Sequence, residues 1–362
     1  MKAKVRNPYP NPSFELPMRL SCVRLSFVVL FIFAACSPEP PPKHLSRAFY
    51  YWKSDLKLKT SEQKALTDLG ASALYVKFFD ISWDRQRNEA LPVAMLRFDS
   101  ATLPKQNIVP VVFLTDESLA KMDARAIVEL ANHAAGAIQS IAHAMQSPLK
   151  EVQFDCDWTA KTESKYFHFI DAARAGLPKG ITISATIRLH QVKYRERTGV
   201  PPIDRGMLMY YNMANWRDAN TKNSIFDRDE AEHYIDYVHD YPLPLDLALP
   251  IFRWTLVYRN NHFLTILNSV SSQDLDRLTF LNHDVRNRYL VKRDTFAFGA
   301  SLRTGDLLRA EECKADQLEE GGRDVLRRIR NEDLRIALYH LDSVTLSHYS
   351  HGTLDSVFSG KS

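Results

Sequence analysis

The sequence predicts a TIM-like (β/α)8 barrel, a ring of eight parallel strands joined by helices, with a small α+β insertion between strands seven and eight. Three observations predict this α/β fold. About 320 residues follow a short leader, a length that suits a single α/β barrel. Apolar runs alternate with helical patterns from residue 44 onward, as in repeated βα units. The gap between the last two apolar runs is too long for a plain loop.

Eight apolar runs are the predicted strands. In chain order they are Ala48–Lys53, Ala73–Asp80, Ile108–Thr115, Glu151–Trp158, Thr182–His190, Gly206–Met213, Leu247–Trp254 and Ile336–Asp342. Helices are predicted at Thr60–Leu69, Tyr166–Ala175, about 229–238 and about 315–330. The clearest helix follows the third strand, where apolar residues recur at spacings of three and four: Ile127, Leu130, Ala134, Ile138, Ile141 and Met145.

The insertion is predicted at about 262–333, within a barrel domain that covers residues 45–362. Its segment Tyr289–Glu312 alternates apolar and polar residues and contains turn signals at Arg293-Asp294 and Thr304-Gly305-Asp306. These features predict a small β-hairpin element inside the insertion.

Residues 1–35 are predicted to be a signal peptide. Arg19 and Arg24 supply positive charge ahead of the apolar run Leu25–Ala35, which is shorter than the roughly 20 residues that a spanning helix needs. The run ends in Phe33-Ala34-Ala35-Cys36, which resembles the lipobox of bacterial lipoproteins. The resemblance implies cleavage before Cys36 and lipidation of its thiol. The alternative is an ordinary signal peptide that a cysteine follows by chance.

Residues 36–44 form a proline-rich tether that favours an extended, semi-rigid chain. The lipoprotein resemblance implies several acyl chains of the palmitate type at Cys36, and several chains anchor a protein stably to a membrane. No aspartate follows Cys36, which favours the outer membrane. The membrane is therefore one expected partner, and the expected location is the cell envelope.

The charge balance argues against a nucleic-acid partner. Of the 47 basic and 43 acidic residues, the leader holds five and one, so 42 of each remain. A neutral domain lacks the positive surface that nucleic-acid binding needs. Only Cys156 and Cys313 remain beyond the leader and Cys36, too few for a disulfide framework or a cysteine metal site.

Polar residues gather where the predicted strands end, which is where barrels of this kind carry function. Residues two apart on a strand share a face. On the fourth strand Asp155 and Asp157 share one face with Gln153, while Cys156 and Trp158 share the other. The apolar face is expected to pack against helices, so that both aspartates point into the barrel mouth.

Asp155 and Asp157 are the candidate catalytic residues. The other candidate ligand-binding residues are Lys77, Asp80, Trp158, Arg188, His190, Tyr211, Asn212, Arg253, Trp254, His340 and Asp342. Burying so many ionisable groups is costly unless they are paired or solvated, so an open polar cleft is expected.

Two short motifs resemble those of family-18 glycoside hydrolases, the chitinases and their relatives. Phe154–Thr159 (FDCDWT) resembles the fourth-strand motif that ends in Asp, any residue, Asp, an aromatic residue and the catalytic Glu. Met209–Asn212 (MYYN) resembles the sixth-strand Met-x-Tyr-Asp. The family also commonly inserts an α+β element between strands seven and eight. The resemblance implies a related barrel and a cleft shaped for a sugar.

The sequence departs from the family pattern at its catalytic positions. The proton donor would fall at Thr159, and threonine cannot protonate a glycosidic oxygen. The first Asp of the fourth-strand motif falls at Val152, and the sixth-strand Asp falls at Asn212. The family uses the Glu as acid and the N-acetyl group of the substrate as nucleophile. The departures therefore predict a related barrel without family-18-type catalysis.

Three functions stay open on the sequence alone. The first is an envelope lipoprotein whose barrel binds a carbohydrate or a similar polar ligand. The second is an active glycoside hydrolase that uses Asp155 or Asp157 as acid and another carboxylate as base. The third is a structural lipoprotein whose barrel is only a scaffold.

No cofactor is predicted. The sequence contains no G-x-S-x-G elbow, Walker loop, dinucleotide fingerprint or H-E-x-x-H motif. His340 and Asp342, together with Asp155 and Asp157, have the donor atoms for a divalent metal, but their spacing is unspecific and no metal site is predicted.

Overall fold

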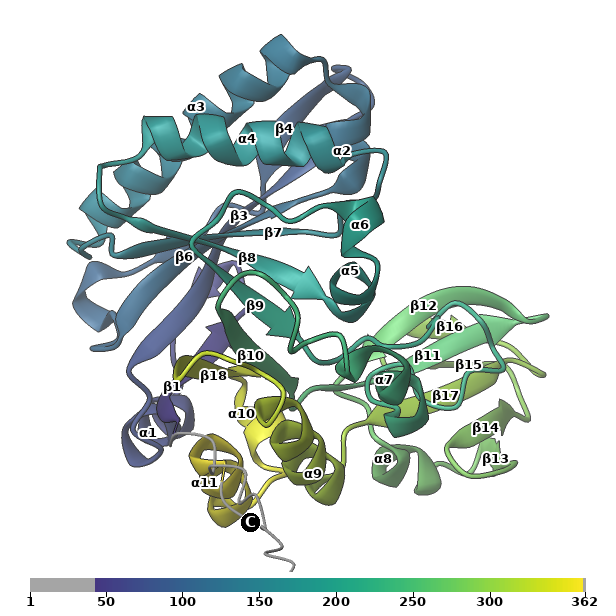
Figure 1. Ribbon diagram of the computed structural model, residues 1–362. Coiled ribbons are helices and arrows are strands. Elements are labelled where there is room, and N and C mark those ends of the chain that lie inside the picture. Colours follow the sequence, from purple (N-terminus) through teal and green to yellow (C-terminus); the bar gives the residue numbers. More distant parts are fainter. Residues whose placement is uncertain (1–42, 361–362) are drawn as a thin grey trace, which may run out of the picture. The chain divides into compact units, whose positions relative to one another are not determined.

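The computed structural model describes residues 43–360 (Figure 1). The predicted signal peptide, Cys36 and nearly all of the tether lie outside the described residues, so their assignments stay predictions. Within residues 43–360, no helix combines the length and apolar character needed to cross a membrane.

Eight parallel strands close into a barrel, which confirms the predicted fold class. They are β1 (His44–Tyr51), β3 (Ala73–Asp84), β6 (Asn107–Leu114), β7 (Glu151–Cys156), β8 (Thr182–Arg188), β9 (Arg205–Met209), β10 (Leu245–Pro250) and β18 (Asp333–Tyr339). Each strand pairs with the next in this order, and the ring closes where β1 pairs with both β3 and β18. All eight correspond to predicted strands, with ends that differ by a few residues.

Short strands extend the barrel near its first two strands. The long β3 continues past the ring and pairs antiparallel with β4 (Glu89–Val93). The two-residue strands β2 (Asp55–Leu56) and β5 (Arg97–Phe98) pair with each other. The connection to β6 also contains a 3-10 turn at Ser100–Thr102.

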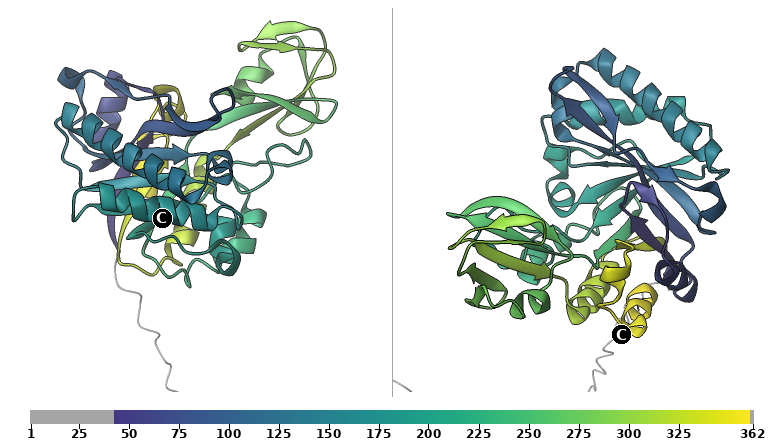
Figure 2. Two further views of the ribbon diagram at one scale, coloured as in Figure 1. Left: turned by 90° about the horizontal axis from the view of Figure 1, so that it is seen from above. Right: turned by 180° about the vertical axis from the view of Figure 1, so that it is seen from behind.

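Helices cover the outside of the barrel (Figures 1 and 2). They are α1 (Thr60–Asp68), α2 (Asp116–Lys121), α3 (Ala124–Ala144), α4 (Glu163–Gly176), α5 (Leu189–Lys193), α6 (Arg195–Thr198), α7 (Arg228–Ile235), α9 (Ala315–Leu326), α10 (Ser343–Leu346) and α11 (His351–Ser359). The longest, α3, begins where the Asp123 side chain accepts a hydrogen bond from the Ala126 backbone, and it buries most of the predicted apolar stripe, with Ile141 half-buried. It packs side by side with α4 in Figure 1.

The alternation predicted for β7 is observed. Phe154 packs edge-on against Phe169 of α4 (centroids 5.4 Å apart), and Trp158 stacks on Tyr166 (4.9 Å). The alternate residue Gln153 is buried inside the barrel. The helix-facing side chains therefore fix the carboxylates of the same strand on the opposite face.

The insertion is a five-stranded antiparallel sheet that follows β10 directly. Its order is β12 (His262–Asn268), β11 (Arg253–Arg259), β17 (Leu307–Glu312), β14 (Arg288–Val291) and β13 (Leu281–His283). The helix α8 (Ser272–Asp276) and the hairpin β15 (Thr295–Ala297) and β16 (Ala300–Leu302) complete it. It has its own small core, which includes Val257, Tyr289 and Leu308.

The insertion therefore spans residues 253–312, not the predicted 262–333. The apolar run Leu247–Trp254 contains two elements, because β10 ends at Pro250 and Arg253 already pairs with Glu312 in the inserted sheet. The helix α9, predicted within the insertion, instead packs on β10 of the barrel. A Cβ added at Gly322 of α9 would lie 3.2 Å from Leu249, so this contact is close.

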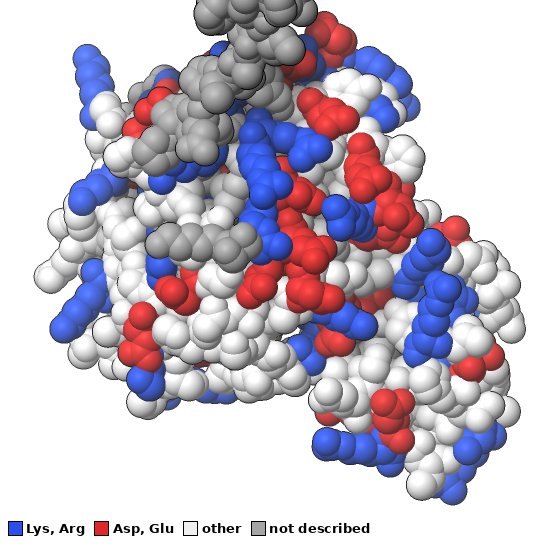
Figure 3. Space-filling model, turned by 60° about the horizontal axis from the view of Figure 1, so that its bottom comes forward, with Lys and Arg blue, Asp and Glu red and all other residues white. Residues whose placement is uncertain are grey.

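Charges of both signs are mixed on the face drawn in Figure 3, where basic and acidic side chains lie beside one another near its centre. Charged side chains of both signs also join α7 to α9. Arg228 forms ion pairs with Glu232, Glu320 and Asp324 at 3.4–3.6 Å. Exposed pairs of this kind contribute little to stability, and they leave the surface balanced in charge.

Candidate ligand-binding site

A cavity of about 640 Å³ lies at the carboxyl ends of the barrel strands, next to the insertion. Its lining comes from all eight barrel strands or the residues that follow them, together with the first two strands of the insertion. The lining residues are Trp52, Lys53, Asp80, Phe113, Asp155, Asp157, Arg188, Met209, Tyr211, Asn212, Phe252, Arg253, Trp254, Asn268, Ser269, Tyr339, His340, Asp342 and Thr345.

Ten of the thirteen predicted site residues belong to this lining. The fold therefore brings together most of the residues that were selected for their place at strand ends. These ten are Asp80, Asp155, Asp157, Arg188, Tyr211, Asn212, Arg253, Trp254, His340 and Asp342. Whether they bind or react with a ligand stays a prediction.

The structure places the other three elsewhere. Trp158 lies in the core, where its indole nitrogen donates to the Thr198 carbonyl (2.7 Å), because its strand face packs on helices. His190 lies outside the lining, because the chain turns into α5 at Leu189 and the strand alternation stops there. Lys77 is buried behind the lining and pairs with Asp80 (2.9 Å).

Several lining residues were not predicted. Trp52 and Lys53 end the first predicted strand, and Tyr339 lies in the eighth, so the same strand-end rule could have included them. Asn268 and Ser269 gave no signal, because they reach the cavity only through the pairing of β12 with β11. The remaining unpredicted residues are Phe113, Met209, Phe252 and Thr345.

Arg188 joins Asp155 of β7 to Asp157, which follows the strand directly. Its Nε donates to Asp157, and its Nη2 lies 3.7 Å from Asp155 Oδ1. Asp155 also accepts a hydrogen bond from the Thr186 hydroxyl (2.6 Å). Asp155 is 4% exposed, whereas the Asp157 side chain is 57% exposed, so the two carboxylates differ strongly in their access to water.

Burial raises the pKa of Asp155 from 3.8 to about 6. The Arg188 guanidinium opposes this shift, and the neighbouring charge of Asp157 adds to it. Asp155 therefore holds its proton to a higher pH than an ordinary aspartate does.

A second set of charges lies across the mouth, after β1 and β18. Lys53 pairs with Asp342 (2.6 Å) and with the buried Glu62 (3.3 Å). Burial raises the pKa of Asp342, but the hydrogen bond and charge of Lys53 outweigh it and hold that pKa below its ordinary value. Asp342 also accepts from the Val344 and Thr345 backbones and so caps α10.

Aromatic rings form another part of the lining around Tyr339. Its ring lies 5.7 Å from Trp52, 5.4 Å from Tyr211 and 5.5 Å from Phe252 between centroids. Phe252 in turn packs edge-on against Trp254 at 5.2 Å. Packed rings of this kind offer a rigid apolar surface beside the charged groups.

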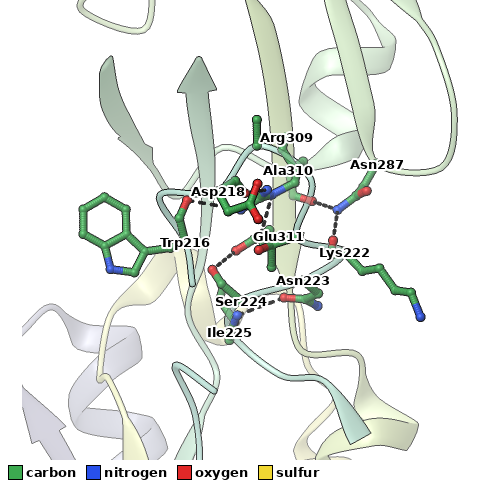
Figure 4. Close-up of polar contacts among 12 residues, drawn as sticks. Trp216, Asp218, Lys222, Asn223, Ser224, Ile225, Asn287, Arg309, Ala310 and Glu311 are labelled. Carbon is green, nitrogen blue, oxygen red and sulfur yellow. Dashed lines mark hydrogen bonds and ion pairs between the residues drawn. The ribbon is translucent and has the colours of Figure 1, made fainter. Parts of the chain in front are cut away.

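The insertion fixes Trp254 from behind. The Trp254 indole nitrogen donates to Glu311 Oε2 (2.7 Å), and the Ser224 hydroxyl donates to the same oxygen. The other oxygen of Glu311 accepts from Arg309 Nε (2.7 Å). Figure 4 shows Arg309, Glu311 and Ser224 within one polar network between β17 and the loop that follows β9.

The same network ties that loop to the insertion. Arg309 donates to the Asp218 carbonyl (2.7 Å) and the Trp216 carbonyl (3.3 Å). Asn287 donates to the Lys222 carbonyl (3.2 Å) (Figure 4). Tyr211 and Asn212 of the lining belong to the start of this loop, so these bonds also help to fix one edge of the cavity.

Thr159, at the position of the family's proton donor, bonds within its own turn of the chain. Its hydroxyl lies 3.2 Å from that of Thr162, which also bonds to Asp116 at the start of α2. Thr159 does not belong to the cavity lining.

Metal ligands are not clustered in the described part of the chain. Within residues 43–360, no group of three or more His, Cys, Asp or Glu side chains is arranged to hold a metal ion. The carboxylates of the cavity bond instead to Arg188, Lys53 and Lys77.

No protein-family model and no curated protein matches this sequence. Solved structures do match the fold. The spore cortex-lytic enzyme SleL of Bacillus cereus is 12% identical with a TM-score of 0.54, and the match covers 88% of this chain and 75% of that one. The chitinase of Chromobacterium violaceum is 14% identical with a TM-score of 0.55, covering 86% of this chain and 98% of that one.

A third similar structure was solved with a sugar. It is a doubly substituted GH18 chitinase from Cycas revoluta in complex with (GlcNAc)4, 12% identical with a TM-score of 0.50, and the match covers 87% of this chain and 98% of that one. Identities this low establish the fold alone. This chain therefore has the TIM-like barrel fold of GH18 chitinases and chitinase-like proteins.

Proposed function

We propose that this protein binds an oligosaccharide in the cavity at the barrel mouth and does not hydrolyse it by the family-18 mechanism. We further propose that a lipid on Cys36 holds it in the cell envelope, at the outer membrane. The fold shared with chitinases supports a carbohydrate ligand, and the cavity lies where barrels of this kind bind their ligands.

The observation that carries the proposal is the contact of Arg188 with both Asp155 and Asp157. A carboxylate that is bound to a guanidinium is held in a fixed orientation, which suits hydrogen bonding to sugar hydroxyls. The charge of Arg188 also lowers the pKa of Asp155 against the effect of burial, and so works against proton donation. Thr159 supplies no acid in its place, because its hydroxyl bonds to Thr162 and it lies outside the lining.

The aromatic part of the lining supports the same ligand class. Sugar rings present apolar C–H faces and polar edges, so a site for them needs flat apolar surfaces beside fixed hydrogen-bonding groups. The rings around Tyr339 supply the surfaces, and Asp157, Asn212 and Lys53 supply polar groups in the same cavity.

A second candidate function is hydrolysis with a different acid. The raised pKa of Asp155, about 6, favours it, because general acids work best when their pKa lies near the working pH. A purely structural role has less support, since the mouth holds a cavity of about 640 Å³ rather than packed side chains.

The test uses the full-length protein, purified in detergent, with chitotetraose and a panel of other oligosaccharides. Calorimetry measures binding, and chromatography of the same mixtures measures hydrolysis. We expect binding without products. Chitinase activity at ordinary enzyme rates would contradict the proposal, and loss of that activity in Asp155→Asn would favour the rewired hydrolase. Absence of binding across the whole panel would favour the structural role.

A further inference from the structure

Two of the three basic side chains that line the cavity are matched by carboxylates of the same lining. Lys53 pairs with Asp342, and Arg188 pairs with Asp155 and Asp157. These cations are already neutralised inside the cavity. Neither offers an unmatched charge to a ligand.

Arg253 is the third basic residue, and its counter-ion lies outside the lining. It is the first residue of β11 and is 7% exposed. Its Nη1 lies 3.3 Å from Glu312 Oε2, and Glu312 does not line the cavity. Within the part of the chain that the structure describes, its buried Nε has no hydrogen-bond partner.

The surroundings of Arg253 and Arg188 shift their pKa values in opposite directions. Burial lowers the pKa of Arg253, and the charge of Glu312 opposes that shift without reversing it. Burial also acts on Arg188, but Asp157 and Asp155 outweigh it and raise the pKa of Arg188. A desolvated cation that the protein balances incompletely is stabilised by an anion brought to it.

Ser269 of the lining contacts Arg253, and His340 of the lining follows the strand that pairs with β10. The Ile251 backbone donates to the Tyr339 carbonyl (2.8 Å), which places the end of β10 beside that of β18, where His340 follows. The buried His340 Nδ1 has no partner among the described residues. The Ser269 backbone donates to the Arg253 carbonyl (3.2 Å), so Ser269 also lies at this end of the cavity.

We propose that the ligand is an acidic oligosaccharide and that a carboxylate on one of its sugars binds Arg253, with His340 and Ser269 as neighbouring hydrogen-bonding groups. This inference rests on the proposed function and names the class of sugar. A guanidinium presents a planar fork that matches a carboxylate with two parallel hydrogen bonds. The carboxylate has two common sources, a lactyl ether on an N-acetylated amino sugar or the acid group of a hexuronic acid.

The experiment compares matched oligosaccharides on the full-length protein by calorimetry. The probes are an N-acetylated tetrasaccharide with lactyl carboxylates, its methyl ester, a tetra-hexuronide, its methyl ester, and neutral chitotetraose. We expect at least one acid to bind about 10- to 100-fold more tightly than its ester, the range for a charge-assisted hydrogen bond. The pair that shows the difference identifies the source of the carboxylate.

The variants test whether Arg253 causes the preference. Arg253→Gln should bind acid and ester equally. Arg253→Lys keeps the charge and should retain part of the preference for the acid. The second variant keeps the test usable where Arg253→Gln folds poorly. Arg303→Gln changes an exposed arginine of the same insertion outside the lining and should behave as wild type. Thermal melting of each variant checks its fold.

Two results would contradict the inference and leave the proposed function standing. One is equal binding of acid and ester by the wild type, together with binding of chitotetraose. The other is an acid preference that survives in folded Arg253→Gln. If none of the five probes binds, the inference is contradicted. If no oligosaccharide of the wider panel binds either, the proposed function is contradicted as well.

Discussion

Arg309 and Glu311 form an ion pair of 2.7 Å on β17, with both side chains fully buried. The pair connects three parts of the molecule. Arg309 bonds to the loop carbonyls of Trp216 and Asp218, and Glu311 holds the indole of Trp254 at the cavity. An ion pair inside the insertion thus fixes both the loop after β9 and one wall of the site.

Arg309→Met should lower the free energy of unfolding by about 3–5 kcal/mol, because it leaves the Glu311 carboxylate buried without its cation. Urea denaturation measures the loss. Arg303→Met, an exposed control on the same insertion, should change it by less than about 0.5 kcal/mol. A loss below 1 kcal/mol in Arg309→Met would show that the buried pair is not needed for stability.

Trp254 and Trp158 should respond in opposite ways to truncation. Trp254→Ala removes an aromatic surface of the cavity and should weaken oligosaccharide binding at least about tenfold, as loss of an aromatic anchor does. Trp158→Phe removes the donor to the buried Thr198 carbonyl and should cost about 1–3 kcal/mol of stability without changing affinity. Calorimetry and denaturation of both variants separate the effects, and the reverse pattern would place the site elsewhere.

The barrel could be predicted from the sequence because its signals are local. Each strand is an apolar run, and the period of two along β7 sorts Asp155 to the interior and Trp158 to the helix layer without any tertiary information. Even so, Trp158 was counted among the ligand-binding residues against that same alternation. His190 lies outside the lining for a different reason. The strand ends at Arg188, and the alternation of faces holds only within a strand.

The insertion and its part of the site could not be predicted in the same way. Whether Arg253 ends a barrel strand or begins an inserted one depends on its pairing with Glu312, 59 positions later. Ser269 reaches the cavity only because β12 folds back along β11. The rings around Tyr339 are apolar residues of strand ends, and in a sequence such residues look like core.

Asp157→Asn should weaken oligosaccharide binding by roughly 1–3 kcal/mol, about 5- to 150-fold in Kd. The exposed carboxylate is a charged hydrogen-bond acceptor of the cavity, and it also orients Arg188. Asp171→Asn on the exposed face of α4 serves as the control. Unchanged affinity in Asp157→Asn would mean that the aspartates have a structural role.

Cys36 is predicted to carry the lipid. Cells that express the wild type and are fed a fatty-acid probe should yield labelled protein, and Cys36→Ala should yield an unlabelled precursor or a soluble form. Cys22→Ala, which changes the cysteine within the predicted leader, should label as wild type. Wild-type protein without label would contradict the lipoprotein prediction.

Stability should depend on pH through Asp155, whose pKa burial raises from 3.8 to about 6. A carboxyl group with a higher pKa in the folded state binds its proton more tightly there than in the unfolded state. The resulting stabilisation is fully present below pH 3.8 and is lost as the pH rises through about 6.

The wild type should therefore lose up to about 3 kcal/mol of unfolding free energy between pH 4 and pH 7 relative to Asp155→Asn, which cannot ionise at this position. Asparagine keeps an oxygen that can accept the hydrogen bond from Thr186, so the variant is a close structural match. Urea denaturation of both proteins across this range gives the difference, in which the contributions of other titrating groups largely cancel. Parallel pH profiles would show that Asp155 ionises as freely in the folded protein as in the unfolded chain, and would remove the physical basis for its use as a general acid.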